Sequence, residues 1–140
     1  MGRRLARESA LQVLFQIDVG KAVLDQALNQ VFSEFAVHGS DQTFAKQLVE
    51  GTIEHQGRLD QIIDRMSVDW GLDRLARVDH NILRLALYEM YYREDIPATV
   101  SVNEAVELAK TFSTEESGKF VNGILGKIIV NPKAYQPHES

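Results

Sequence analysis

The chain has 140 residues, a formal net charge of -5 and no cysteine. That length suits one domain that buries a hydrophobic core without a metal or a disulfide. The lack of cysteine excludes disulfides, zinc-thiolate sites, iron-sulfur clusters and thiol catalysis, and it is typical of a reducing cytosol. The N-terminus has no long apolar run with a cleavage site, and no segment reaches membrane-spanning length. We therefore expect a cytoplasmic protein without a membrane anchor, folded as a single domain over residues 1–140.

The charge is unevenly distributed along the chain. Residues 1–7 and residues 117–138 carry basic side chains and no acidic ones, whereas the segment between them is acidic. If the two ends meet in the fold, they form one basic patch on an acidic body. Because local potential rather than net charge governs where an anion docks, the negative net charge does not exclude a nucleic-acid partner.

Apolar residues recur at helical spacing in the first half of the chain. They predict three helices: residues 6–20, residues 24–35 and residues 40–66. Ser40 is the predicted N-cap of the third helix, and Gly57 kinks that helix rather than ending it. Trp70 stands in a connector and is expected to fill the seam between two helical halves. Asp69 and Asp73 are predicted caps, with one short helical turn over residues 73–77.

The second half begins with a segment, residues 79–93, whose apolar residues cover most of the helical circumference. Such a helix is buried at the centre of a bundle. Pro97 then breaks the chain, and Ser101-x-x-Glu104 and Ser113-x-x-Glu116 read as capping boxes that open two more helices. The tail, residues 132–140, is expected to be frayed. The sequence thus predicts an all-α fold, a bundle of about six or seven helices in two packed halves.

Three arginines lie on consecutive turns at the N-terminus. Helical geometry places Arg3, Arg4 and Arg7 within about a quarter turn of one another, beside the apolar stripe. Guanidinium groups in this arrangement can hold several phosphates with bidentate geometry. The alternative is a solvated end that only aids solubility, and the segment alone does not decide between the two.

A second candidate site lies at residues 119–123, Lys-Phe-Val-Asn-Gly. Glycine inside a helix costs about 1 kcal/mol relative to alanine, so Gly123 implies close approach by another backbone, for which we expect the central helix. An aromatic ring beside a lysine is also what single-stranded RNA recognition uses, because bases stack on the ring while phosphates pair with the cation. Phe120 is therefore a stacking residue or a core residue, and Phe15 and Phe112 carry the same ambiguity.

Enzymatic interpretations have weaker support. The acidic pairs Glu104 with Glu107 and Asp60 with Asp64 lie one helical turn apart, as metal or acid-base pairs do, but a capping role and solvated faces account for them. The four histidines show no ligand spacing, and no glycine-rich phosphate loop is present. We expect no catalytic residue, no metal and no cofactor.

Three segments carry a resemblance to a known family: RRLARESALQVLFQID (residues 3–18), ILRLALYEM (residues 82–90), and SVNEAVELAKTF with EESGKFVNGIL (residues 101–125). On these residues, and on the helix spacing between them, the chain resembles the NusB family of bacterial transcription antitermination factors. The same fold is similar to the N-terminal domain of ribosomal RNA cytosine methyltransferases. The catalytic cysteines of those enzymes are absent here, which favours the stand-alone factor.

The resemblance implies a non-catalytic protein that binds box A RNA of ribosomal RNA operons together with NusE, a small-subunit ribosomal protein. It further implies a complex with NusA, NusG and RNA polymerase, and it leaves a monomer or a homodimer open. By position, Arg4 and Arg7 match the family's arginine-rich RNA-binding helix, although Leu5 interrupts an arginine run that is often denser. Asp79 matches an acidic position that faces NusE.

A second RNA-contacting strip follows from the same resemblance. Its matching residues are Phe112, Glu116, Lys119 and Phe120, with Glu116 in place of an Asp found in some members. Two alternatives to this function remain open. One is a protein-protein adaptor that does not touch RNA, and the other is a stand-alone RNA-binding domain related to the methyltransferases.

Overall fold

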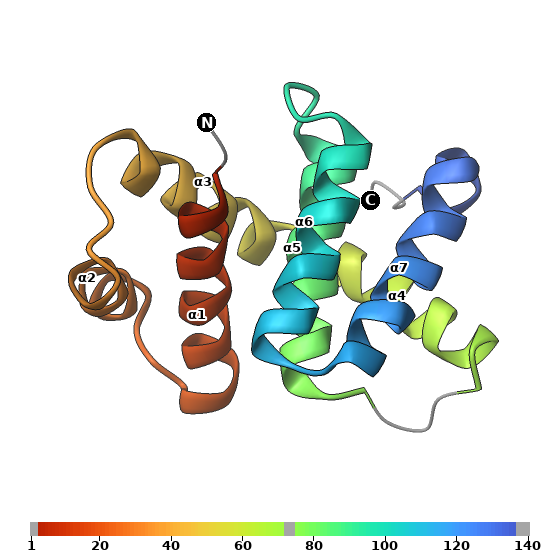
Figure 1. The fold of residues 1–140 in the computed structure, drawn as a ribbon, viewed down its shortest axis with the longest axis horizontal. Coiled ribbons are helices and arrows are strands. Elements are labelled where there is room, and N and C mark those ends of the chain that lie inside the picture. Colours follow the sequence, from red (N-terminus) through yellow and green to blue (C-terminus); the bar gives the residue numbers. More distant parts are fainter. Residues whose placement is uncertain (1–2, 72–74, 137–140) are drawn as a thin grey trace. The chain divides into compact units, whose positions relative to one another are not determined.

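The computed structural model describes residues 3–71 and 75–136. These residues form seven α-helices and one 3-10 helix, with no strand among them, so the predicted all-α fold of six or seven helices is confirmed (Figure 1). The chain divides into two compact units, Met1–Glu54 and His55–Ser140. That the whole chain acts as one RNA-binding domain stays a prediction.

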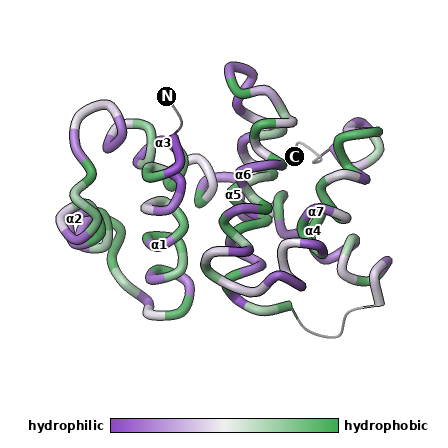
Figure 2. The backbone as a smooth tube through the Cα atoms, viewed as in Figure 1, coloured by the Kyte–Doolittle hydropathy of each residue, from purple (hydrophilic) through white to green (hydrophobic). Residues whose placement is uncertain are grey.

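The first unit contains α1 (Arg4–Gly20), α2 (Leu24–Glu34) and α3 (Ser40–Glu54). Helix α1 packs against both of the others. Hydrophobic and hydrophilic residues alternate along α1 in Figure 2, as expected for a helix with one buried face. The helix ends at Gly20 as predicted, but the residue in the left-handed conformation is Lys21, at φ 57°.

The second unit contains α4 (Gln56–Asp69), α5 (Arg77–Tyr92), α6 (Ala98–Phe112), α7 (Glu115–Val130) and the 3-10 helix η1 (Pro132–Tyr135). Helix α5 contacts α4, α6 and α7. Its residues from Asn81 to Glu89 are all buried. The prediction of a central helix surrounded on nearly every side is therefore confirmed within this unit.

Polar side chains of α5 are buried with its apolar ones, and two of them reach different neighbouring helices. Arg84 donates from Nε and Nη2 to the two carboxylate oxygens of Asp60 on α4, at 2.7 and 2.8 Å. Glu89, 1% exposed, accepts from the Ser101 hydroxyl on α6 at 2.8 Å. Because a buried polar group without a partner costs about 1–3 kcal/mol, these bonds fix which helix lies on which side of α5.

The predicted long third helix is wrong, because α3 ends at Glu54 and α4 begins at Gln56. His55 separates them with φ -103° and ψ 11°, outside helical geometry. Its ring stacks on that of Tyr92, with centroids 3.8 Å apart. We attribute the break to this tertiary contact, since no helix-breaking residue marks position 55 and Gly57 lies inside α4.

Three capping predictions are also wrong. Helix α6 begins at Ala98, directly after Pro97, so Ser101 lies inside the helix and Glu104 is not a capping residue. Helix α7 is capped by Thr114 rather than Ser113, because the Thr114 hydroxyl accepts from the Ser117 amide at 2.9 Å. The predicted cap Ser40 is itself the first residue of α3.

Part of the predicted frayed tail is ordered. Pro132–Tyr135 form η1, and the Pro132 and Ala134 carbonyls accept from the Tyr91 hydroxyl and from Arg65. Residues 137–140 lie outside the described residues, as do Asp73 and Arg74 at the start of the predicted turn over residues 73–77; Leu75 and Ala76 of that turn are not helical. Among the helices that the structure describes, none combines the length and the apolar character needed to cross a membrane.

The link between α4 and α5 is electrostatic as well as geometric. Burial by itself would raise the pKa of Asp60, but hydrogen bonds from His80 and Arg84 and their charges outweigh it and lower the pKa to about 2. His80 Nε2 lies 2.9 Å from Asp60 Oδ1. The ionised carboxylate is therefore the form that the folded protein stabilises.

Replacing Asp60 with Asn should lower the free energy of unfolding at pH 7 by about 2 kcal/mol, because it leaves the buried guanidinium of Arg84 without its anion. The folded-state pKa lies below the unfolded value of about 3.9, so this stabilisation is complete above about pH 4 and is lost as the pH falls toward 2. Urea unfolding followed by helical circular dichroism at several pH values measures it. Asp64→Asn, an exposed site one turn away on α4, is the matched control. A difference between wild type and Asp60→Asn that stays constant down to pH 2 would contradict the assignment.

Candidate functional site

The three N-terminal arginines have different environments in the first unit. Arg3 donates from Nη1 to Asp41 Oδ1 at 3.0 Å, and its guanidinium lies 4.7 Å from the centre of the Phe44 ring. Arg7 lies over the same ring at 5.5 Å and is only 4% exposed. Arg4 is exposed. Arg3 and Arg7 thus help to pack α1 onto α3, and Arg4 presents its side chain to solvent.

The first two turns of α7 carry most of the predicted second strip. Its first turn holds Glu115 and Glu116, where negative charge is favoured by the helix dipole. Glu116 and Lys119 are exposed, while Phe120 is half-buried. These three side chains are therefore available to a ligand on the surface of the second unit.

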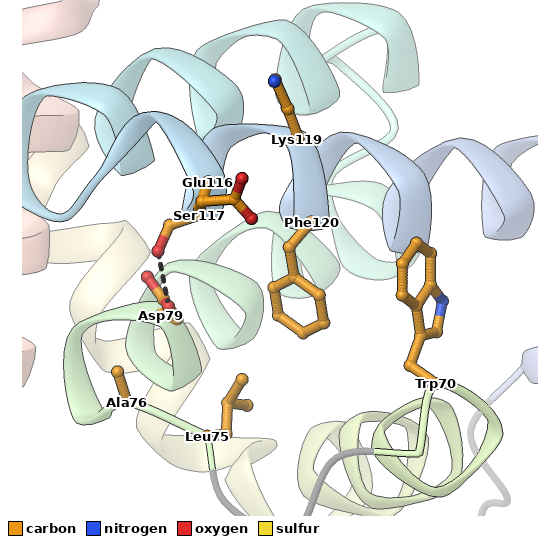
Figure 3. Close-up of a pocket in the computed structure, with 8 residues that line it drawn as sticks. All are labelled: Trp70, Leu75, Ala76, Asp79, Glu116, Ser117, Lys119 and Phe120. Carbon is orange, nitrogen blue, oxygen red and sulfur yellow. Dashed lines mark hydrogen bonds between the residues drawn. The ribbon is translucent and has the colours of Figure 1, made fainter.

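Glu116, Lys119 and Phe120 line a cavity of about 500 Å³ in the second unit. Its lining residues are Trp70, Leu75, Ala76, Asp79, Glu116, Ser117, Lys119 and Phe120. Figure 3 shows the Phe120 ring pointing from α7 toward Leu75 and Ala76, whereas Lys119 extends away from that side of the helix. The cavity is thus apolar around Phe120, with acidic groups at one end and a cation at its edge.

Asp79 lines this cavity from the first turn of α5. It is 6% exposed, and its Oδ2 accepts from the Ser117 hydroxyl at 2.9 Å. Its Oδ1 is buried and has no hydrogen-bond partner among the described residues. The side chain is therefore not an exposed charge, and the expected contact with a partner protein stays a prediction. An unpaired buried oxygen next to a cavity is typical of a functional site rather than of an optimised core.

Trp70 is the cavity residue that sequence reasoning placed elsewhere. It lies just after α4, is 46% exposed, and meets Phe120 edge to face with ring centroids 5.7 Å apart. A Cβ atom at Gly123 would lie 2.7 Å from its indole ring. The close neighbour of Gly123 is therefore the Trp70 side chain and not the backbone of the central helix. Because nearly half of the ring is exposed, Trp70 is also not buried as the prediction of a seam-filling residue requires.

The remaining predicted site residues do not line the cavity. Phe112 ends α6 and is half-buried, but it does not line the cavity. The cavity residues of α7 and Asp79 lie in the second unit, and the arginines lie in the first. That the two sets join in one basic patch stays a prediction.

The acidic pair Asp60 and Asp64, which was considered for catalysis, has no shared site. Asp60 is held by Arg84 and His80, and its pair partner Asp64 is exposed. Among the described residues, no three acidic or histidine side chains gather in a way that could hold a metal ion. What the site offers chemically is a place for an aromatic or flat ligand beside hydrogen-bond acceptors and one cation.

Comparisons with known proteins agree on one family. The model of the NusB family matches residues 4–130. A transcription antitermination protein NusB of Desulforamulus reducens is 55% identical over 137 residues, which cover 98% of this chain and 96% of that protein.

Solved structures agree as well. NusB of T. maritima matches with a TM-score of 0.83 and 38% identity, covering 96% of both chains. A chain in a crystal structure of the antitermination factors NusB and NusE in complex with double-stranded RNA matches with a TM-score of 0.80 and 30% identity, covering 90% of this chain and 94% of that one. With a family match over nearly its whole length, the chain belongs to the NusB family.

Proposed function

We propose that this chain is a cytoplasmic, non-catalytic transcription antitermination factor that binds box A RNA together with NusE and supports transcription of ribosomal RNA operons. The observation that carries the proposal is the cavity on α7, which Phe120 lines with its ring and Lys119 borders with an exposed cation. Family membership supports it, and so does the similar structure described as NusB and NusE in complex with double-stranded RNA. NusA, NusG and RNA polymerase are the further partners that this function implies.

The physical basis of the proposal is a division of labour between side chains. Lys119 and the exposed Arg4 would pair with phosphates, which supplies affinity without reading sequence. An unpaired base would stack on or beside Phe120, and Glu116 would accept hydrogen bonds from base N–H groups. The acidic remainder of the surface would repel nucleic acid elsewhere and would suit a basic ribosomal protein.

One observation favours the alternative of an adaptor that does not touch RNA. Arg3 and Arg7 lie over the Phe44 ring, and Arg3 is also paired with Asp41. Two of the three arginines that are predicted to bind phosphates therefore make contacts within the first unit. In that case a segment of a partner protein would bind in the α7 cavity.

Titration of fluorescently labelled box A RNA, with and without NusE, separates these two functions. We expect the chain to bind the RNA alone and to bind it more tightly with NusE, with affinity falling as salt rises because phosphate contacts release counterions. Fluorescence anisotropy gives both dissociation constants. Binding to NusE with no contribution to RNA affinity would support the adaptor instead.

Replacing Lys119 with Gln should weaken RNA binding and lower the slope of log affinity against log salt by about 0.7, the value for one contact to single-stranded nucleic acid. Lys127→Gln is the matched control, because Lys127 is also exposed on α7 but does not line the cavity. Anisotropy titrations at four salt concentrations measure both variants. Equal slopes for the two variants would remove Lys119 from the binding site.

The N-terminal arginines should separate into two classes. Arg4→Gln should reduce RNA affinity and its salt dependence at nearly unchanged stability, since Arg4 is exposed. Arg7→Ala should lower the free energy of unfolding by about 1–2 kcal/mol, because it removes a buried cation from the face of Phe44. Urea unfolding and RNA titration of both variants test this, and a destabilised Arg4→Gln with a stable Arg7→Ala would reverse the assignment.

A further inference from the structure

We propose that the α7 cavity takes one unpaired nucleobase, which stacks on Trp70, and that Trp70 is thereby a further RNA-binding residue seated by Gly123. The inference rests on the proposed RNA binding and adds to it a residue and a chemical class of ligand. It starts from the exposure of Trp70. Nearly half of this large ring, 46%, remains open to solvent although it lines a cavity.

The position of the Trp70 indole depends on a glycine of α7. Gly123 has no Cβ, and an added one would lie 2.7 Å from Cζ2 and 2.8 Å from Cη2 of the ring. The ring thus lies directly on the backbone of α7, at a site where glycine costs helix stability. A ring that abuts a helix backbone along one edge and is 46% exposed is a suitable stacking platform.

The geometry of the two rings limits what fits beside them. The planes of Trp70 and Phe120 are at 87° to each other, so a flat ligand can stack on only one of them. A base lying parallel to the indole meets the Phe120 ring at a right angle, which is a favourable aromatic arrangement. The volume of about 500 Å³ is within the range of small-molecule sites and exceeds what one side chain needs.

The polar lining favours a base over an apolar partner side chain. The Glu116 carboxylate stands at the cavity as an exposed acceptor for the N–H groups that nucleobases carry on their edges. An apolar side chain would leave that acceptor unused. The exposed Lys119 at the edge would attract the phosphate that accompanies a base.

Trp70 is the only tryptophan of the chain, so its fluorescence reports on this cavity alone. The probes are single-stranded oligoadenylate and oligouridylate of twelve nucleotides, with the duplex of the two as the control. We expect saturable quenching by the single strands, stronger for adenine because it stacks better, and little quenching by the duplex, whose bases are already stacked.

Substitutions connect the quenching to affinity. Trp70→Ala should weaken single-strand binding by roughly 5- to 100-fold, the range for loss of one base stack, and Trp70→Phe should restore part of it. Gly123→Ala should displace the indole, changing its emission and weakening binding. Gly126→Ala is the matched control, because nothing lies within 4 Å of a Cβ at that glycine of the same helix.

The outcomes distinguish this inference from the proposed function. If RNA binds and Lys119→Gln weakens it, while Trp70 emission and the affinity of Trp70→Ala stay unchanged, the base site is wrong and the RNA-binding function stands. If neither oligonucleotides nor box A RNA bind, the proposed function fails. If NusE alone changes Trp70 emission and Gly123→Ala weakens NusE binding but not RNA binding, the cavity faces a protein and the inference is overturned.

Discussion

The burial of α5 is the constraint on which the second unit depends. A helix enclosed by α4, α6 and α7 cannot leave its polar groups to water, so each needs a partner within the protein. Arg84 binds Asp60 on α4, Glu89 binds Ser101 on α6, and Asp79 binds Ser117 on α7. These three bonds fix the orientation of the neighbouring helices around α5. Apolar packing alone does not fix it, because apolar contact is not directional.

The candidate site lies where this arrangement is least complete. Of Arg84, Glu89 and Asp79, it is Asp79 that has a buried oxygen without a hydrogen-bond partner among the described residues, and Asp79 stands beside the cavity that Phe120 and Trp70 line. The same helix that organises the unit therefore also supplies one wall of the site. The start of α5 thus combines a buried hydrogen bond to α7 with one wall of the candidate site.

The N-terminal arginines illustrate how one residue type serves two purposes. All three occupy similar positions in the sequence pattern, yet Arg7 is buried on Phe44 and Arg4 is exposed. The long arginine stem packs well on an aromatic ring and its charge is tolerated there. The number of arginines in a helix therefore does not tell how many positive charges the helix exposes to a ligand.

The sequence by itself determined the all-α fold, the approximate number of helices and the central position of residues 79–93 in the second unit. Apolar periodicity carries this information, because it reflects which face of each helix is buried. Gly123 correctly signalled a close approach. Only the tertiary structure decided that the neighbour is Trp70, that Ser101 binds Glu89 instead of capping a helix, and that His55 separates α3 from α4. Each of these depends on a side chain distant in the sequence, and local propensity contains no information about such a partner.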